Sequence, residues 1–266
     1  MLLAIDVGNT NTVLGLYDLT AVPPKLVSDW RITTPLNQTA SELGVILANL
    51  FALSKLEMAL VDGIAISSVV PPLDPILRHV CELYFGGEKK IKPLFIEPGI
   101  KTGLPVLTDN PSEVGADRIV NCVAAFEQFG GPSIVVDMGT ATTFDVISKK
   151  GEFLGGAIAP GLRISADALF SRAARLPRVD IKRPAKVIGT STVDNMQIGL
   201  YFGYIGLVDG ILERMIAELG AETKVVATGG LAKVIAGGSK HIKAVDDMLT
   251  LTGLRIIYER NQKMKR

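Results

Sequence analysis

One short pattern occurs twice in this chain, and its copies lie about half a chain length apart. AIDVGNTNTV carries Asp6 and VVDMGTATTF carries Asp137, a separation of 137 − 6 = 131 positions in 266 residues. The same shift places Thr12 on Thr143. In both copies an apolar run reaches an aspartate, turns through small residues and resumes as a second apolar run. Matched position, flanking runs and chemistry favour an internal duplication over coincidence. We therefore expect two related α/β lobes, residues 1–116 and 117–266.

Apolar periodicity predicts the elements of the first lobe. Strands are expected at 2–7, 12–19, 29–34, 61–70 and 93–98. A helix is expected at 39–57, which has helical apolar spacing and Glu42 in its first turn. A second helix is expected at 72–85, which has proline in its opening turn.

The second lobe is expected to repeat this order. Strands are predicted at 133–138, 142–148, 152–161 and 224–228, and helices at 162–176, at 191–220 and from 231. The long helical region could be interrupted near Gly203 or Gly206. The charged tail, YERNQKMKR, is expected to be a solvated end.

The turn after Asp6 has two interpretations. Gly and Asn tolerate the backbone of a tight turn, so GNTN suits an ordinary β-hairpin. The same residues offer hydroxyls and backbone N–H groups beside a carboxylate, which suits a phosphate group and its cation. The duplication supplies a second such turn after Asp137, and ligands usually bind in clefts between lobes. Two turns facing one cleft could hold a polyphosphate and its cation, so the phosphate site is favoured.

A third cluster, NPSEVGADR, lies between the two copies. Asp117 and Arg118 are adjacent, so on a helix they would point about 100° apart and would not pair with each other. They could be exposed charges in the first turns of a helix. If the chain binds ATP, the carboxylate could instead align an acceptor hydroxyl and take its proton, while the arginine holds a carboxylate of the acceptor. The pattern then suits an acceptor with one hydroxyl and one carboxylate.

Three further segments suit either ligand contact or ordinary structure. GGAIAPGL, residues 155–162, could be a loop against the ligand or a tight turn between strand and helix. The glycines of VVATGGLA could let the backbone approach an adenosine, although a lone GG is a weak signal. Residues 190–192 could cap the following helix or contact the ligand. The chain contains no G-x-x-x-x-G-K-[ST] pattern, which excludes a Walker-type P-loop kinase.

Composition narrows the class of protein. Hydrophobic residues make up 48% of the chain and the mean hydropathy is +0.35, which supplies a sizeable core and argues against disorder. No apolar run reaches the ~20 residues of a membrane span, and the N-terminus begins a strand without signal-peptide features. A cytoplasmic protein without a membrane partner is expected. Cys81 and Cys122 are expected to be free buried thiols, and zinc is not expected.

The net charge of +1 gives no case for a nucleic-acid partner. The charge is uneven, since residues 1–116 hold 8 basic and 12 acidic residues whereas 117–266 hold 20 basic and 15 acidic residues. The basic second half could favour an anionic ligand or could reflect the charged tail.

Six motifs together resemble the type III pantothenate kinases, a family within the acetate and sugar kinase/Hsp70/actin superfamily. They are, in order, IDVGNTNT, NP-x-x-VGADR, VVDMGTATTFD, GGAIAPG, GTST before a long helix with MQIG, and VVATGGLA. They span residues 3 to about 232, and six motifs in family order form a highly specific signature. The resemblance implies two ribonuclease-H-like, actin-like lobes and phosphorylation of pantothenate by ATP, the first step of coenzyme A synthesis.

The resemblance also implies cations, a partner and residue roles. Members are generally homodimers with the pantothenate pocket near the dimer interface, and they need Mg²⁺ or another divalent ion with ATP and a monovalent cation, K⁺ or NH₄⁺. Carried across, ATP is expected at Asp6, Val7, Gly8, Asn9, Thr10, Asn11, Thr12, Val13 and Thr140, with Asp6 near the divalent ion. Pantothenate is expected at Gly115, Ala116, Asp117, Arg118 and Thr192, with Asp117 as catalytic proton acceptor and Asp137 as ligand of the monovalent cation.

One position departs from the family pattern. Many members have tyrosine nine residues before the catalytic aspartate, where this chain has Thr108. A tyrosine would offer a flat ring and a phenol, whereas Thr108 offers a methyl and a hydroxyl. We therefore expect a slightly altered pantothenate pocket and not a lost one, because GADR is intact.

Three alternative functions stay open on the sequence. They are a non-catalytic regulator of the same fold, a superfamily kinase for another small hydroxy acid or sugar, and a phosphatase of exopolyphosphate type. The intact Asp117 argues against the regulator, and GADR in its NP-x-x-VGADR context argues against the other kinases.

Overall fold

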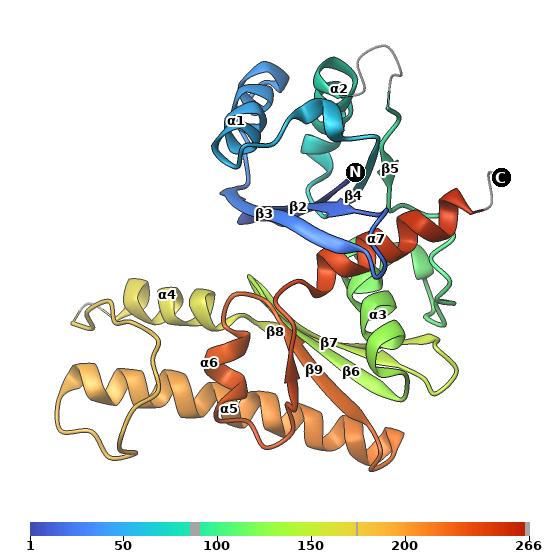
Figure 1. Ribbon diagram of the computed structural model, residues 1–266. Coiled ribbons are helices and arrows are strands. Elements are labelled where there is room, and N and C mark those ends of the chain that lie inside the picture. Colours follow the sequence, from blue (N-terminus) through green and yellow to red (C-terminus); the bar gives the residue numbers. More distant parts are fainter. Residues whose placement is uncertain (86–90, 174, 264–266) are drawn as a thin grey trace. The chain divides into compact units, whose positions relative to one another are not determined.

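The computed structural model describes residues 1–85, 91–173 and 175–263, and the chain forms two compact units (Figure 1). Unit 1 comprises Met1–Leu104, Asn110–Ala124 and Thr250–Arg266, and unit 2 comprises Pro105–Asp109 and Ala125–Leu249. The expected division after residue 116 falls inside the first turn of helix α3 (Ala116–Phe129), whose two ends belong to different units. The C-terminal segment groups with unit 1, so the units interleave along the chain.

Unit 1 contains a five-stranded mixed sheet. Its strands are β1 (Leu2–Val7), β2 (Asn11–Asp18), β3 (Lys25–Thr33), β4 (Gly63–Ser68) and β5 (Leu94–Phe95), in the order β3-β2-β1-β4-β5. β2 pairs antiparallel with β1 and β3, whereas β4 pairs parallel with β1 and β5. β1 is central and buried on both faces, as its continuous apolar run indicates.

Helices α1 (Ala40–Leu53) and α2 (Asp74–Tyr84) cover one face of this sheet, with short 3-10 helices at Met58–Leu60 and Pro71–Leu73 (Figure 1). Thr39 and Glu42 form a reciprocal capping box at the start of α1, where the sequence places Glu42 in the first turn.

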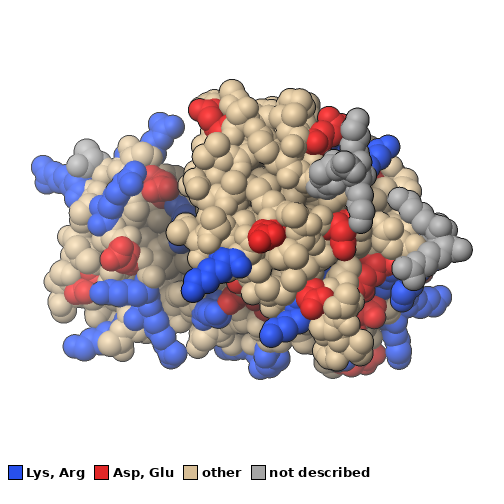
Figure 2. Space-filling model, turned by 45° about the horizontal axis from the view of Figure 1, so that its top comes forward, with Lys and Arg blue, Asp and Glu red and all other residues tan. Residues whose placement is uncertain are grey.

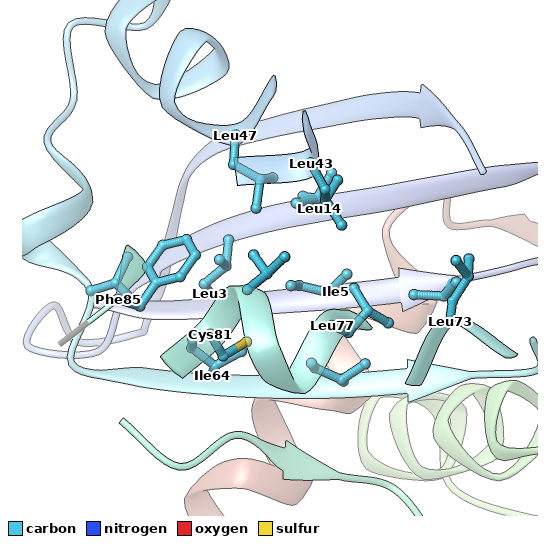
Figure 3. Packing of buried hydrophobic residues seen from close by; sticks show 14 of the residues in the cluster. Leu3, Ile5, Leu14, Leu43, Leu47, Ile64, Leu73, Leu77, Cys81 and Phe85 are labelled. Carbon is cyan, nitrogen blue, oxygen red and sulfur yellow. The ribbon is translucent and has the colours of Figure 1, made fainter. Parts of the chain in front are cut away.

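The core of unit 1 lies between these helices and the sheet. Figure 3 shows Leu3 and Ile5 of β1 on the side of Leu47 of α1 and Leu77 of α2, and all four are at most 4% exposed. Residues 3 and 5 alternate with 2, 4 and 6, so the side chain of Asp6 belongs to the opposite face of the sheet.

Helices α3 and α7 (Leu249–Gln262) pack on that opposite face (Figure 1). A Cβ on Gly63 would lie 2.0 Å from the Tyr258 hydroxyl oxygen, and one on Gly15 would lie 2.7 Å from Leu251 Cδ1. Side chains of α7 therefore fill space that only glycine leaves open. The expectation of a solvated tail is wrong for the described residues, because α7 continues to Gln262 and Arg260 donates to the Thr102 carbonyl.

Unit 2 contains the second five-stranded sheet. Its strands are β6 (Ser133–Met138), β7 (Ala141–Ile147), β8 (Phe153–Pro160), β9 (Lys224–Thr228) and β10 (Ala244–Val245), in the order β10-β9-β6-β7-β8. Its helices are α4 (Leu162–Arg172), α5 (Thr192–Leu219) and α6 (Ala232–Ala236). The core of unit 2 combines Val136 and Phe144 of the sheet with Tyr201 and Val208 of α5 and Ile235 of α6.

The two sheets share one topology, which confirms the predicted duplication. In both, the first strand pairs antiparallel with the second and parallel with the fourth. The turns differ in length, because residues 8–11 separate the paired Val7 and Thr12, whereas 139–141 separate Met138 and Thr142. Thr12 therefore corresponds in structure to Thr142, not to Thr143.

The strand predicted at 152–161 and the helix predicted at 191–220 are confirmed by β8 and α5, whereas the two alternatives left open for these segments are wrong. GGAIAPGL is not a loop, because residues 155–160 belong to strand β8. A Cβ on Gly156 would lie 1.8 Å from the Phe144 carbonyl oxygen, so this strand needs glycine to pair closely with β7. The long helix α5 is not interrupted at Gly203 or Gly206 and runs without a break from Thr192 to Leu219.

Both cysteines are free and buried, as expected. Burial raises the pKa of the Cys81 thiol to about 12, so this thiol is unreactive at neutral pH. Among the described residues, no cluster of three or more His, Cys, Asp or Glu could hold a metal ion. No helix in that part of the chain is both long and apolar enough to span a membrane.

Candidate functional site

The first turn joins β1 to β2 in unit 1. The Gly8 N–H donates to the Asn11 carbonyl at 3.0 Å, and a Cβ on Gly8 would lie 3.1 Å from that oxygen. Glycine suits this position because the backbone approaches closely, and Gly8 does not need the positive φ that a turn glycine often adopts. Thr34 fastens the turn, since its N–H donates to Thr10 O at 3.0 Å and its hydroxyl donates to Gly8 O.

The residues predicted to bind ATP phosphates differ in what they can offer. Asn9 and Thr10 are exposed at the tip of the turn, and Asp6, Gly8, Asn11 and Val13 are partly buried. Val7 is 1% exposed and belongs to the core, so only its backbone is available. Thr12 is 3% exposed and its hydroxyl lies 3.3 Å from that of Thr34. Thr12 and Thr34 therefore support the turn from below.

The GADR cluster, Gly115–Arg118, lies at the same end of the same sheet. β1 and β4 end side by side, because the Val69 N–H donates to Val7 O at 3.0 Å. A Cβ on Gly115 would lie 3.7 Å from Val69 Cγ1 and 2.6 Å from Asp117 Oδ1. The structure thus brings Asp117 to the carboxyl end of β4, beside the strand from which the first turn emerges.

Asp117 is partly buried in the first turn of α3. Its Oδ1 accepts a hydrogen bond from the Arg118 N–H at 2.8 Å. Loss of solvent raises the pKa of the Asp117 carboxyl above its ordinary value, and the Arg118 N–H and guanidinium oppose this rise in part. A carboxylate with a raised pKa accepts a proton more readily than an ordinary aspartate.

The second turn, in unit 2, lies against two glycines. A Cβ on Gly229, which has a φ of +94°, would lie 2.7 Å from Asp137 Oδ1. A Cβ on Gly161 would lie 2.2 Å from the carbonyl oxygen of Thr140, which is exposed at the tip of the turn. The structure therefore brings Asp137 and Thr140 together with the GG after β9 and the end of β8. Gly229 is needed both for its left-handed backbone and for the approach of the carboxylate.

Tyr204 of α5 supports the second turn through hydrogen bonds of its hydroxyl group. Its hydroxyl donates to Pro160 O at 3.2 Å and is hydrogen-bonded to the hydroxyl of Thr142. Burial raises the pKa of the Tyr204 phenol, so it stays protonated as a donor. The ring of Tyr204 belongs to the core of unit 2.

Thr192 is the exposed first residue of α5. The helix cap is its neighbour Ser191, whose hydroxyl accepts from the Asp194 N–H at 3.1 Å. Thr192 lines an open groove of about 500 Å³ together with Leu169, Met196 and Leu200. Its own side chain is thus available to a ligand in unit 2.

A basic segment follows α4 in unit 2. Residues 172–186 contain six Lys or Arg residues and one acidic residue, Asp180. Figure 2 shows Lys and Arg gathered over the part of unit 2 that carries α4, at the left of the view. The basic balance of the second half of the sequence is therefore not due to the tail alone.

Comparison with known proteins decides the family. Residues 2–214 match the model of a family described as type III pantothenate kinase. This chain belongs to the type III pantothenate kinase family.

Relatives named type III pantothenate kinase are similar to this family member over nearly the whole chain. One from Koribacter versatilis is 62% identical over 272 residues, covering 100% of this chain and 98% of the relative. One from Acidobacterium capsulatum is 60% identical over 261 residues, covering 97% of this chain and 94% of the relative.

Solved structures confirm the actin-like α/β fold expected of this kinase family. A putative 2-dehydro-3-deoxygalactonokinase from Sinorhizobium meliloti has a TM-score of 0.59 at 14% identity, covering 98% of this chain and 96% of that one. A putative Baf family transcriptional activator from Campylobacter jejuni has a TM-score of 0.57 at 19% identity, covering 98% and 99%. At such identities the likeness concerns the fold alone.

The residues near the first turn fit the divalent ion that a kinase uses with ATP. Mg²⁺ prefers oxygen ligands and is usually held by one or two carboxylates together with phosphates and waters, not by a cage of protein groups. Asp6 supplies such a carboxylate at the end of β1, and the described residues contain no larger acidic cluster that could form a cage.

Thr108, the position that departs from the family pattern, lies beside β8. The Leu107 N–H donates to Phe153 O at 2.8 Å, and Thr108 Cγ2 lies 3.9 Å from where a Cβ on Gly155 would be. Within the described chain its buried hydroxyl has no hydrogen-bond partner. An altered pantothenate pocket stays a prediction, which the pantothenate KM of a Thr108→Tyr variant would test.

Replacing Asp117 by Asn is expected to raise the midpoint of thermal unfolding at neutral pH. Because burial raises the folded-state pKa of Asp117, the folded chain binds more protons than the unfolded chain as pH rises from the unfolded to the folded pKa. The stability that this group contributes is therefore lost as pH increases through that window. The Asn variant does not lose it, because the amide does not titrate.

Calorimetric scans of the wild type and Asp117→Asn between mildly acidic and neutral pH measure this effect. The gap between the two midpoints should widen as pH rises, and the exposed Asp109→Asn serves as control. A gap that is absent, or that narrows with rising pH, contradicts the account.

Proposed function

We propose that this chain transfers the γ-phosphoryl group of ATP to the primary hydroxyl of pantothenate, giving 4′-phosphopantothenate at the first step of coenzyme A synthesis. The family match over residues 2–214 and full-length relatives named type III pantothenate kinase support a kinase that acts on pantothenate. The observation that supports the residue assignment is the approach of Gly115 and Asp117 to the end of β4, beside β1 and its turn.

In this proposal the exposed tip of the first turn, at Asn9 and Thr10, binds the phosphates of ATP. Asp117 accepts the proton of the pantothenate hydroxyl. The oxygen of that hydroxyl bonds to the γ-phosphorus while the bond between the γ-phosphorus and ADP breaks. Arg118 binds the pantothenate carboxylate with its planar guanidinium. Mg²⁺ bound with ATP supplies charge neutralisation of the phosphates, and Asp6 is the residue that would hold it.

A coupled ADP-release assay with MgATP, with and without pantothenate, tests the proposed function. Mass spectrometry of the product should show phosphopantothenate. Asp117→Asn should lower kcat by about 10²–10⁴ with ATP binding retained, the usual contribution of a positioned base. Asp109→Asn should keep wild-type activity.

Two results of this assay would contradict the proposal. A loss below tenfold in Asp117→Asn would move the base elsewhere. Wild-type protein that binds ATP without pantothenate-dependent ADP release would instead favour a non-catalytic regulator of the same fold. A panel of other hydroxy acids and sugars separates pantothenate from rival acceptors.

We further propose that Asp137 binds a monovalent cation, K⁺ or NH₄⁺. Its carboxylate is partly buried at the end of β6 and faces the Gly229 backbone, where peptide oxygens and a carboxylate can replace the water ligands of an ion. Asp137→Ala should abolish activation by potassium, measured as the ratio of rates in potassium and sodium buffers. An unchanged ratio would remove this assignment.

A homodimer formed through unit 2 is also part of the proposal. Gly199, Gly203 and Gly206 lie along the outer face of α5, and apart from the backbone of α5 itself no described atom lies within 4 Å of where their Cβ atoms would be. Gly199 borders the groove that contains Leu169, and Ile164 of α4 is 42% exposed. Small residues along a helix allow a second helix to approach closely, and exposed apolar side chains favour burial between copies.

Gly203→Arg should convert the dimer to a monomer, because a long charged side chain would block this face of α5. Light scattering after size-exclusion chromatography measures the mass of the wild type and the variant. Ala52→Arg, at an exposed alanine of α1 in unit 1, is the control and should stay dimeric. A monomeric wild type, or a dimeric Gly203→Arg, would refute this interface. A cytoplasmic location stays a prediction.

A further inference from the structure

Ser67 of β4 carries a buried hydroxyl that the folded chain does not use. Its side chain is 0% exposed, and within the described residues its Oγ has no hydrogen-bond partner. An unpaired hydroxyl in a protein interior costs free energy that an alanine would not cost. A native group of this kind requires an explanation beyond packing.

The position of Ser67 points toward the first turn. β4 runs parallel to β1, and Ser67 is the partner of Asp6 in the register. Paired residues on neighbouring strands project to the same face, about 4.8 Å apart. Leu3, Ile5 and Val7 belong to the core on the other face, so the Ser67 hydroxyl and the Asp6 carboxylate share the face toward α3.

The same end of β4 also meets the GADR cluster. Two residues after Ser67, Val69 donates its N–H to Val7 O and lies 3.7 Å from where a Cβ on Gly115 would be. Ser67 therefore lies between the carboxylate expected to hold the divalent ion and the segment expected to hold the acceptor. A strand spacing of about 4.8 Å is suited to one water between a hydroxyl and an ion held by the neighbouring carboxylate.

We propose that Ser67 is a positioning residue for the divalent ion of MgATP, with its hydroxyl bonded to a water in the hydration shell of the ion. Mg²⁺ keeps several of its waters when it binds to proteins, so partners of those waters fix where the ion lies. The inference rests on the proposed function, since it assigns a ligand role at the same turn. It adds a residue that neither the repeat nor the family motifs single out.

Ser67→Ala tests this role, with Ser133→Ala as matched control. Ser133 is likewise 0% exposed and without a hydrogen-bond partner in the described chain, but it lies at the first residue of β6 and not beside an aspartate at a turn. Calorimetric titration with a non-hydrolysable ATP analogue is carried out in Mg²⁺ and again in EDTA. A second variant, Ser67→Cys, keeps the size and weakens the donor.

In Mg²⁺, Ser67→Ala should bind the ATP analogue about tenfold more weakly than the wild type does, which is the smallest loss usual for residues that contact a ligand of the metal. In EDTA, the variant and the wild type should bind the analogue equally. The Mg²⁺ concentration for half-maximal activity should rise similarly, the melting midpoint should not fall, and Ser67→Cys should resemble Ser67→Ala. Ser133→Ala should change none of these readouts.

Equal affinities of Ser67→Ala and wild type in Mg²⁺ would overturn the proposal. So would an equal loss in Mg²⁺ and in EDTA, which indicates a packing role. The titrations need no pantothenate, so they remain decisive if the wild type releases no ADP with pantothenate and the proposed function itself fails.

Discussion

In each unit the candidate ligand-binding turn depends on an aspartate near the end of the central strand of the sheet, fixed from both sides by main-chain pairing. Asp6 pairs with Val13 on the antiparallel side and Ser67 on the parallel side, and Asp137 pairs with Thr143 and Thr228. A slip of one residue in either ladder would turn the carboxylate to the other face. The shorter second turn leaves the parallel partner in place, so both sheets present the carboxylate at the same point of the fold.

For the carboxylate of Asp117, the environment that suits catalysis differs from the one that would stabilise the folded chain most. Burial in the first turn of α3 raises its pKa, which suits a proton acceptor and at the same time reduces stability at neutral pH. Such a cost is common at functional sites, where residues suited to catalysis are not those that would stabilise the fold most. The unpaired buried hydroxyl of Ser67 likewise reduces stability at a position with a proposed role in ligand binding.

Local signals explain what the sequence predicted well. The strand, aspartate and turn of both copies, the helix start with Glu42 in its first turn and the continuous apolar run of β4 all depend on neighbours within a few residues. The duplication then predicted the shared topology, because related segments form related ladders. The GADR motif was placed correctly at the start of a helix for the same local reason.

Contacts distant in sequence explain what the sequence did not predict. The strand at 152–161 was predicted, but a loop stayed open for its glycines, because nothing local reveals that Gly156 faces the Phe144 carbonyl. Helix α7 was missed because its partners, Gly15 and Gly63, lie almost a chain length away. The support of the turns by Thr34 and Tyr204 depends on folded geometry in the same way. The composition of the sequence likewise does not show that each unit is assembled from separate segments of the chain.

The central claim is that the turn after Asp6 holds the phosphates of ATP while Asp117 faces the acceptor hydroxyl. A crystal structure with a non-hydrolysable ATP analogue, Mg²⁺ and pantothenate tests it most directly. The account predicts phosphate oxygens at the tip of the turn and the primary hydroxyl of pantothenate within hydrogen-bond reach of Asp117. Phosphates bound away from Asn9 and Thr10, or a pantothenate hydroxyl beyond the reach of Asp117, would contradict it.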